Sequence, residues 1–265
     1  MIPPDYHMHT PLCRHASGEP IEYAAHAVKV GLREIGFSDH SPMSRDDFDD
    51  WRMPLADLDL YVSKVQEARR AFPQLTIRLA LEVDYLPGHE AWIKELANRH
   101  PWDYFIGSVH YISDSFAIDN PHQISLWRQG SPKEIWATYF DRLTMAAESG
   151  LFEIIGHADL CKKFSIRPEG DCTPLYRRFL EAAKRNDVAI ELNTAGLRKE
   201  CREIYPSREF LQLAAEIGVP ITFGSDAHAA SEPGMDFEAA ITLAKSCGYR
   251  ESRTFCGREY SSIPF

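Results

Sequence analysis

Histidine and carboxylate residues recur along this chain at spacings that metal sites use. A His-x-His pair, His7 and His9, stands near the start, and an Asp-x-His pair, Asp226 and His228, stands near the end. On an extended strand, residues i and i+2 project from the same face, so His7 and His9 can hold one ion together. A single pair of this kind arises often by chance. An ordered series of such residues between the two pairs is much more specific.

That series is completed by His15, His40, Glu82, His110 and His157. All of these except His15 stand at or just after the end of a predicted strand. Imidazole together with carboxylate suits zinc, iron or manganese better than calcium. No cysteine shares the pattern, so a structural zinc site of the cysteine type is not expected. We therefore expect the nine residues to form one metal cluster, and we expect the remaining histidines to be structural or surface residues.

The elements that would position this cluster alternate along the chain. Short apolar runs predict seven strands, and amphipathic stretches between them predict seven helices. The predicted strands are 5–9, 34–38, 77–83, 104–109, 153–156, 188–192 and 220–223, and the predicted helices are 21–30, 57–72, 90–99, 132–149, 174–185, 207–217 and 237–246. This alternation is typical of an α/β fold with a parallel sheet. In a parallel barrel the carboxyl ends of the strands meet on one face, where catalytic residues gather.

Two stretches, 41–58 and 111–131, show no regular pattern. Each is near the upper length of an ordinary loop, which favours a lid that faces the substrate. Trp51, Asp84 and Tyr111 are candidates for lining a substrate pocket there, and the sequence does not choose between them.

Length, composition and charge fit a soluble enzyme. The 265 residues suit one domain that covers 1–265. The net charge of −10 argues against nucleic acid or an anionic membrane as the main partner. Bound cations would reverse the local sign for a phosphate substrate. The six cysteines lack C-x-x-C spacing, and the start of the chain lacks the features of a signal peptide, so we expect reduced thiols and a cytoplasmic location.

The ordered set of nine residues resembles the signature of the PHP (polymerase and histidinol phosphatase) superfamily. Every position of that signature is present, and the resemblance covers essentially the whole chain. Within the superfamily, the segments 37–42, 51–53, 159–164 and 191–199 look like those of the histidinol-phosphate phosphatases, although these segments are less specific than the metal set.

The resemblance implies a distorted (β/α)7 barrel with three divalent ions, zinc, manganese or iron, at the carboxyl face of the strands. It implies that one ion is held by His7, His9, Glu82 and Asp226, a second by Glu82, His110 and His157, and a third by His15, His40 and His228. The implied reaction is hydrolysis of L-histidinol phosphate in histidine biosynthesis, through attack of a metal-bridging hydroxide on phosphorus.

Further residues are expected to serve this reaction. Glu82, Asp226 and His228 are the expected catalytic ligands. Arg198, Lys163 and Lys162 are the expected phosphate contacts, because guanidinium and ammonium groups bind phosphate oxygens. The expected partner is a small phosphate ester, and the expected assembly is a monomer or a small homo-oligomer.

Three other functions share part of this pattern. A PHP-type phosphoesterase that acts on nucleotides or on general phosphate esters would use the same ligands. A metal-storing or regulatory module would be expected to have lost some of them. An amidohydrolase-like enzyme that cleaves C–N bonds would need a carbamylated lysine or a glutamate after the fourth strand, where this chain has His110.

Overall fold

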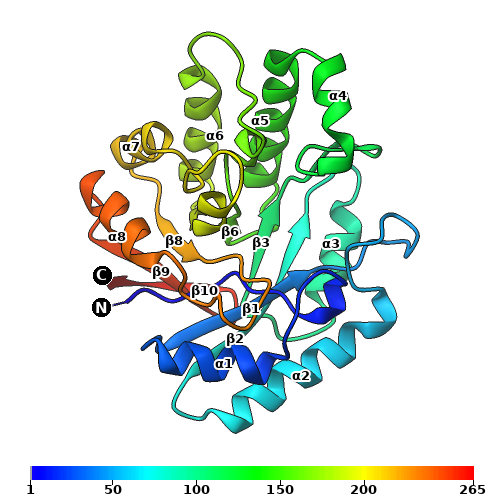
Figure 1. The fold of residues 1–265 in the computed structure, drawn as a ribbon, viewed down its shortest axis with the longest axis vertical. Helices are drawn as coiled ribbons and strands as arrows, with labels where there is room; N and C mark the ends of the chain where they lie inside the picture. Colours follow the sequence, from blue (N-terminus) through cyan, green and yellow to red (C-terminus); the bar gives the residue numbers. More distant parts are fainter. Residues whose placement is uncertain (1) are drawn as a thin grey trace.

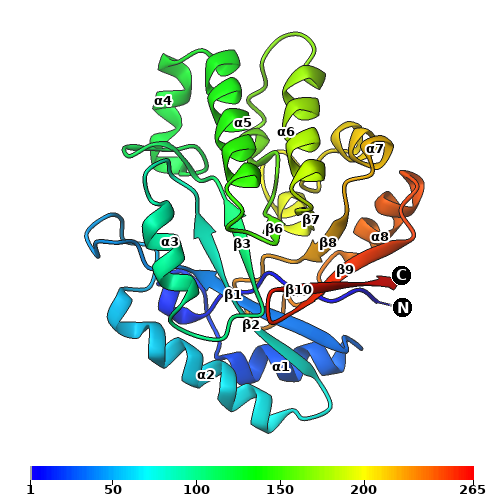
Figure 2. The same cartoon turned by 180° about the vertical axis from the view of Figure 1, so that it is seen from behind.

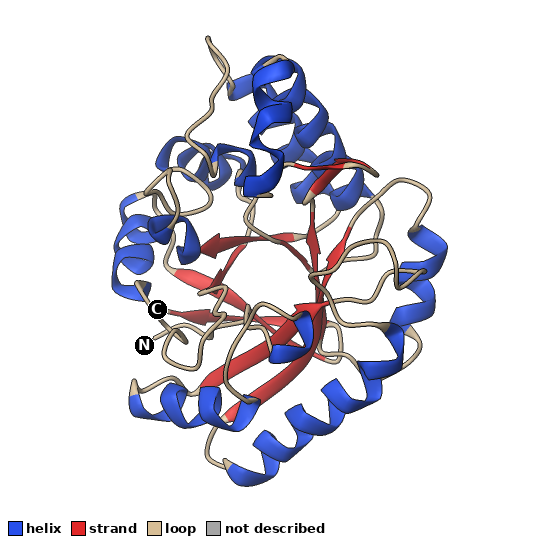
Figure 3. Ribbon diagram, turned by 45° about the vertical axis from the view of Figure 1, so that its right-hand side comes forward, coloured by secondary structure: helices blue, strands red, loops and turns tan. Residues whose placement is uncertain are grey.

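The structure, a computed structural model, describes residues 2–265. Six parallel strands form its main sheet, in the order β1 (Glu34–His40), β2 (Thr76–Asp84), β3 (Tyr104–Ser108), β6 (Ile154–Ile155), β7 (Ala189–Asn193) and β8 (Ile221–Gly224). The sheet curls into a ring of strands with the helices outside it (Figures 1 and 3). The fold is the distorted α/β barrel that the sequence predicts.

The segment 5–9 completes the ring between β1 and β8. On one side Gly36 N donates to Asp5 O at 2.8 Å, and on the other His9 N donates to Ala227 O at 2.9 Å. These contacts are isolated parallel bridges and not a continuous ladder. The sequence therefore predicted the position of this segment correctly, but the expected regular strand is replaced by an extended, intermittently paired segment.

The helices surround the barrel at the places that the amphipathic stretches indicate. They are α1 (Pro20–Lys29), α2 (Leu58–Ala71), α3 (Glu90–Ala97), α4 (Ile124–Gln129), α5 (Pro132–Glu148), α6 (Thr173–Arg185), α7 (Arg208–Ile217) and α8 (Phe237–Ser246). Of these, only α4 has no counterpart among the predicted helices. No helix within residues 2–265 combines the length and the apolar character needed to span a bilayer.

A C-terminal hairpin, β9 (Glu251–Cys256) and β10 (Glu259–Pro264), was not predicted. It lies beside the N-terminal segment, and the two chain ends are close together in opposite views (Figures 1 and 2). Phe255 of β9 packs against Tyr6 and Tyr104, each with ring centroids 5.7 Å from its own. With Ile106, these side chains fill the barrel interior as a small separate core.

The two long irregular stretches differ from each other. The stretch 111–131 contains a hairpin of β4 (Tyr111–Ser113) and β5 (Phe116–Ala117), a 3-10 turn and α4, so it is more ordered than the sequence suggests. The stretch 41–58 holds one 3-10 turn, Leu55–Asp57, before α2 begins. Both stretches follow the carboxyl ends of strands, on the face where the predicted metal ligands stand.

Candidate metal centre

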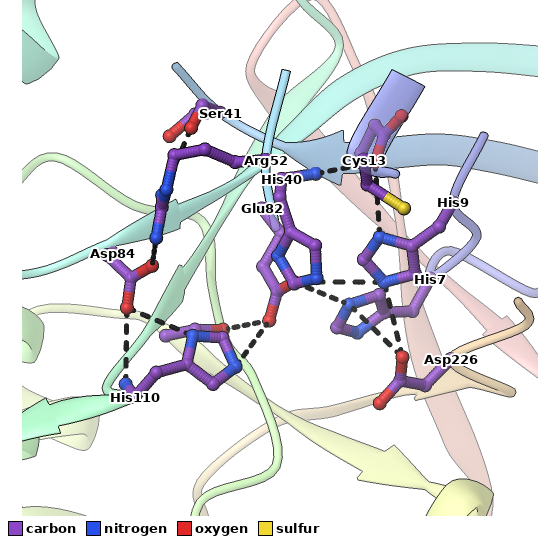
Figure 4. Close-up of polar contacts among 12 residues, drawn as sticks. His7, His9, Cys13, His40, Ser41, Arg52, Glu82, Asp84, His110 and Asp226 are labelled. Atoms are coloured by element: carbon purple, nitrogen blue, oxygen red, sulfur yellow. Dashed lines mark hydrogen bonds and ion pairs between the residues drawn. The ribbon is translucent and has the colours of Figure 1, made fainter. Parts of the chain in front are cut away.

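The nine residues of the predicted metal set gather at the carboxyl ends of the strands, and Figure 4 labels His7, His9, His40, Glu82, His110 and Asp226. His40 ends β1, Glu82 lies near the end of β2, and His110 and His157 follow β3 and β6. Six of the nine are buried, Asp226 and His228 are partly exposed, and His15 is exposed. Residues far apart in sequence are thus brought into one group by the barrel.

Glu82 lies at the middle of this group. Its Oε2 is 2.7 Å from His40 Nδ1 and 3.3 Å from His7 Nε2. Its Oε1 is 2.9 Å from His157 Nε2 and 3.6 Å from His110 Nε2. The two oxygens of one buried carboxylate therefore face two different sets of imidazoles, which is the arrangement of a carboxylate that bridges two ions.

Asp226 and His228 border the same group on the side nearer to solvent. Asp226 Oδ1 lies 3.2 Å from His9 Nε2 and 3.4 Å from His228 Nδ1. His228 Nε2 lies 3.0 Å from His15 Nε2. Burial and the neighbouring His9 lower the pKa of His228 to about 3, which keeps its ring neutral and its lone pair available to a metal ion.

Three groups drawn from the nine residues have donor atoms within 4.8 Å of one another, as one metal ion requires. They are His7, His9 and Glu82; Glu82, His110 and His157; and His15, His40 and His228. The division matches the one that the family resemblance implies, and Asp226 stands next to the first set. Each set mixes imidazole with a carboxylate or consists of imidazole alone, and such sets suit zinc, manganese or iron.

Polar atoms without partners point to ions at this place. Within residues 2–265, His7 Nε2, His9 Nε2 and Glu82 Oε2 are buried and make no hydrogen bond of good geometry, and the polar atoms near them belong to the cluster itself. A buried polar atom that lacks a partner costs about 1–3 kcal/mol. Coordination to a cation would satisfy all three atoms, so the donor set fits divalent metal ions.

The electrostatics of the group also favour positive charge. Burial would raise the pKa of Glu82, but the charge on neighbouring histidines, first His7, outweighs it and holds that pKa well below its usual range. Burial opposes the charged form of His9, but Asp226 and Asp39 raise the pKa of His9 to about 9. Ionised carboxylates that attract protons to nearby imidazoles will also attract metal ions, which displace those protons.

Cys13 also lies at the cluster, contrary to the expectation that no cysteine takes part in it. Its thiol forms a further group of possible metal donors with His9 and His228, and the residue is fully buried. Burial first, and the nearby Asp39 next, raise the pKa of Cys13 above its ordinary value, so the thiol keeps its proton in the absence of a metal. The sequence signal was the position of Cys13 between His9 and His15.

Three carboxylates that were not among the predicted site residues in this position contact the Nδ1 atoms of cluster histidines. Glu191 Oε1 lies 2.7 Å from His7 Nδ1, Asp84 Oδ1 lies 3.0 Å from His110 Nδ1, and Asp39 Oδ1 lies 3.3 Å from His9 Nδ1. Carboxylates in such positions fix the ring orientation and raise the basicity of metal-binding histidines.

The expected phosphate contacts occupy different places. Arg198 lies beside the strand end that carries Asp226, because its Nη2 donates to Ser225 O at 2.7 Å. Its Nη1 is buried without a hydrogen-bond partner and has Asp236 Oδ2 at 3.6 Å. Of the three expected phosphate contacts, Arg198 is the one with a buried side-chain nitrogen, Nη1, that has no hydrogen-bond partner.

The two lysines are engaged elsewhere. The fully buried Lys162 Nζ donates to Ile204 O at 2.7 Å and pairs with Asp159 at 2.9 Å and with Glu203 at 3.2 Å. Lys163 Nζ donates to the backbone O of Asp119 at 2.7 Å and pairs with its carboxylate at 3.0 Å. The polar contacts of both lysines are therefore with the protein, and their contact with phosphate remains a prediction.

Comparisons with known proteins give this arrangement a family context. A family model described as "PHP domain" matches residues 5–195. The chain is 39% identical to a protein of Deinococcus radiodurans named "Probable histidinol-phosphatase", over 93% of this chain and 94% of that one. It is 30% identical to the histidinol-phosphatase of Bacillus subtilis, over 89% and 97% of the two chains.

A solved structure has the same fold. The histidinol phosphate phosphatase of Lactococcus lactis, crystallised with zinc, L-histidinol and phosphate, superposes with a TM-score of 0.84 at 23% identity, over 98% of this chain and 99% of that one.

Proposed function

Because the chain belongs to the PHP domain family, within its histidinol-phosphatases, we propose that it hydrolyses L-histidinol phosphate to L-histidinol and inorganic phosphate. The observation that carries the proposal is the set of buried imidazoles around the two oxygens of Glu82, with donor atoms that lack other partners. The zinc, L-histidinol and phosphate of the Lactococcus lactis protein support the same substrate and cofactor class.

The proposed centre holds three divalent ions, zinc, manganese or iron. His7, His9 and Asp226 would hold one ion and His110 and His157 a second, with Glu82 serving both, and His15, His40 and His228 would hold the third. When bound, such ions lower the pKa of coordinated water towards about 7 and neutralise charge on the phosphoryl oxygens.

The side chains at the open edge of the cluster would handle the substrate. Arg198 reaches the strand end that carries Asp226 through Nη2, which donates to Ser225 O, while its Nη1 makes no hydrogen bond. Its planar fork suits two phosphate oxygens. Asp226 and His228 are the more exposed catalytic ligands, with 17% and 28% of their side chains accessible, whereas Glu82 is 1% accessible. We therefore place the leaving alkoxide on the Asp226 and His228 side.

We also propose a cellular location and an assembly for the enzyme. The six cysteines are free thiols and the net charge is −10, which support a cytoplasmic enzyme without a nucleic-acid partner. A monomer or a small homo-oligomer remains the expected assembly.

The deciding experiment is steady-state kinetics on protein reconstituted separately with manganese, zinc and iron. We expect three ions per chain by elemental analysis, and kcat/KM for L-histidinol phosphate at least about 100-fold above that for nucleotides and p-nitrophenyl phosphate. A nucleotide preference would replace the proposal with the nucleotide-directed alternative. Metal-loaded protein that is inert towards every phosphate ester would favour the metal-storing module.

A further inference from the structure

β7 is the strand of the main sheet that supplies none of the nine cluster residues, yet it ends in two buried polar side chains. Glu191 and Asn193 are 1% and 0% exposed. They stand two residues apart on β7, so both side chains project from the same face of the sheet. Their contacts show that this face is the barrel interior beneath the cluster.

Glu191 connects two cluster residues that come from different parts of the barrel. Its Oε1 lies 2.7 Å from His7 Nδ1, and its Oε2 accepts a hydrogen bond of 2.9 Å from the backbone N of His157. When the Nδ1–H of His7 donates to Glu191, the lone pair on Nε2 is left facing the cluster. That Nε2 is one of the buried atoms without a partner.

Asn193 extends this connection to a third cluster residue. Its Nδ2 donates to Glu191 Oε2 at 3.1 Å and to Asp226 Oδ2 at 3.2 Å. Its Oδ1 accepts from Ala195 N at 2.9 Å, which fixes the orientation of the amide. Holding Oδ2 of Asp226 in this way leaves Oδ1 turned towards His9 and His228.

Two residues that form hydrogen bonds with the side chains of β7 have unusual backbone conformations. His157 has φ of +25° and Asp226 has φ of +53°. Non-glycine residues with positive φ are uncommon, and such conformations persist where the surrounding structure holds them. His157 is held through its backbone N and Asp226 through its carboxylate, in both cases by a side chain of β7.

The neighbouring strands leave room for the Glu191 carboxylate. A Cβ atom added at Gly224 would overlap Glu191 Oε1, and one added at Gly156 would meet Ser108 and Ile106 and approach Glu191 Oε2. Glycine on β8 and after β6 thus allows the Glu191 side chain to reach both His7 and His157.

We propose that Glu191 and Asn193 are positioning residues, which set the orientation of His7, His157 and Asp226 and thereby the affinity of the cluster for its metal ions. The inference rests on the metal centre of the proposed function. A carboxylate accepts hydrogen bonds at both oxygens, whereas an amide has a single acceptor oxygen. Glu191→Gln must therefore leave either His7 or the His157 backbone without its acceptor.

The test measures metal binding apart from hydrolysis. In competition with a chelator, Glu191→Gln should bind zinc or manganese about 10- to 100-fold more weakly than the wild type, the usual effect of losing a residue that orients a ligand. The absorption spectrum of the cobalt-loaded protein should change, and excess metal should restore most of the hydrolysis. Asn193→Ala should also weaken metal binding, and it provides the test if Glu191→Gln folds poorly.

Glu153→Gln is the matched control. Glu153 is another largely buried carboxylate that accepts from a backbone N–H, that of Phe105 at 2.7 Å, but it stands before β6 at the opposite end of the barrel. Its replacement should leave metal affinity and the cobalt spectrum unchanged. The inference is overturned if Glu191→Gln and Asn193→Ala both bind metal with wild-type affinity. It is also overturned if Glu191→Gln and Glu153→Gln lose equal affinity. In either case the proposed function still stands. A wild-type protein that binds no metal would overturn both.

Discussion

Arg52 Nη2 lies 2.9 Å from Asp84 Oδ2, and both side chains are buried. Asp84 Oδ1 contacts His110 Nδ1 at 3.0 Å, and Arg52 also pairs with Asp49 of its own loop. The irregular stretch 41–58 is therefore tied to a cluster histidine through a buried ion pair.

We expect Arg52→Ala to destabilise the protein by about 3–5 kcal/mol, because it leaves the buried Asp84 carboxylate without its cation. Urea denaturation of the metal-free protein measures this free energy. The control is Arg45→Ala, which removes the ion pair with Asp47, whose side chains are 57% and 81% exposed. That surface pair should contribute less than about 1 kcal/mol. Equal losses in the two variants would contradict the role assigned to the buried pair.

We expect Trp51 to contact the organic part of the substrate. Its ring meets that of His40 edge to face with centroids 4.6 Å apart, and its Nε1 donates to Tyr111 OH at 2.9 Å. We expect Trp51→Ala to raise KM for L-histidinol phosphate about tenfold, through loss of an aromatic contact of roughly 1.4 kcal/mol. KM for glycerol phosphate, which has no ring, should stay nearly constant, and Trp51→Phe should retain most of the preference. Equal increases for both esters would refute this role.

Arg198 is expected to bind the phosphate group. Arg198→Ala should raise KM about 10- to 100-fold through loss of a charged hydrogen bond, with the metal content unchanged. The neighbouring Lys199 is exposed, and Lys199→Ala is the control that should leave KM unaltered. If Arg198→Ala keeps the wild-type KM, the phosphate contact must be sought elsewhere.

Lys162 is expected to act on stability more than on substrate binding. Its buried Nζ is paired with Asp159 at 2.9 Å, so Lys162→Met should cost about 3–5 kcal/mol of unfolding free energy and leave KM near the wild-type value. Lys163→Met is the comparison, because Lys163 and its partner Asp119 are 18% and 24% exposed and their pair should contribute less. A raised KM with unchanged stability in Lys162→Met would instead support the phosphate contact predicted from the sequence.

The sequence predicts the strands and the cluster because each signal is local. Apolar runs mark β1, β2, β3, β6, β7 and β8, and cluster ligands stand at or just after the ends of all of these except β7. The hairpin of β9 and β10 escaped prediction because its strands are largely polar, and Phe255 is the main apolar side chain that it buries. The helix α4 has only six residues, too few for a clear periodic pattern.

The orienting carboxylates could not be assigned from the sequence for a different reason. Glu191 and His7 are 184 residues apart, and nothing local to Glu191 distinguishes it from any other polar residue in a strand. Asp39 stands next to His40 but orients His9, which lies 30 residues away. Such pairings depend on which strands are neighbours in the barrel, and spacing along the chain does not contain that information.

The position of the segment 5–9 between β1 and β8 affects how the newly synthesised chain can fold. Ser225 N donates to Asp5 Oδ1 across 220 residues of chain, so the ring cannot close until β8 has been translated. A nascent chain on the ribosome carries His7 and His9 long before Asp226 and His228 exist. Contacts of such long range form slowly. The first and third of the proposed metal sites therefore become complete only after β8 has been translated, and a chain truncated before β8 would lack part of both.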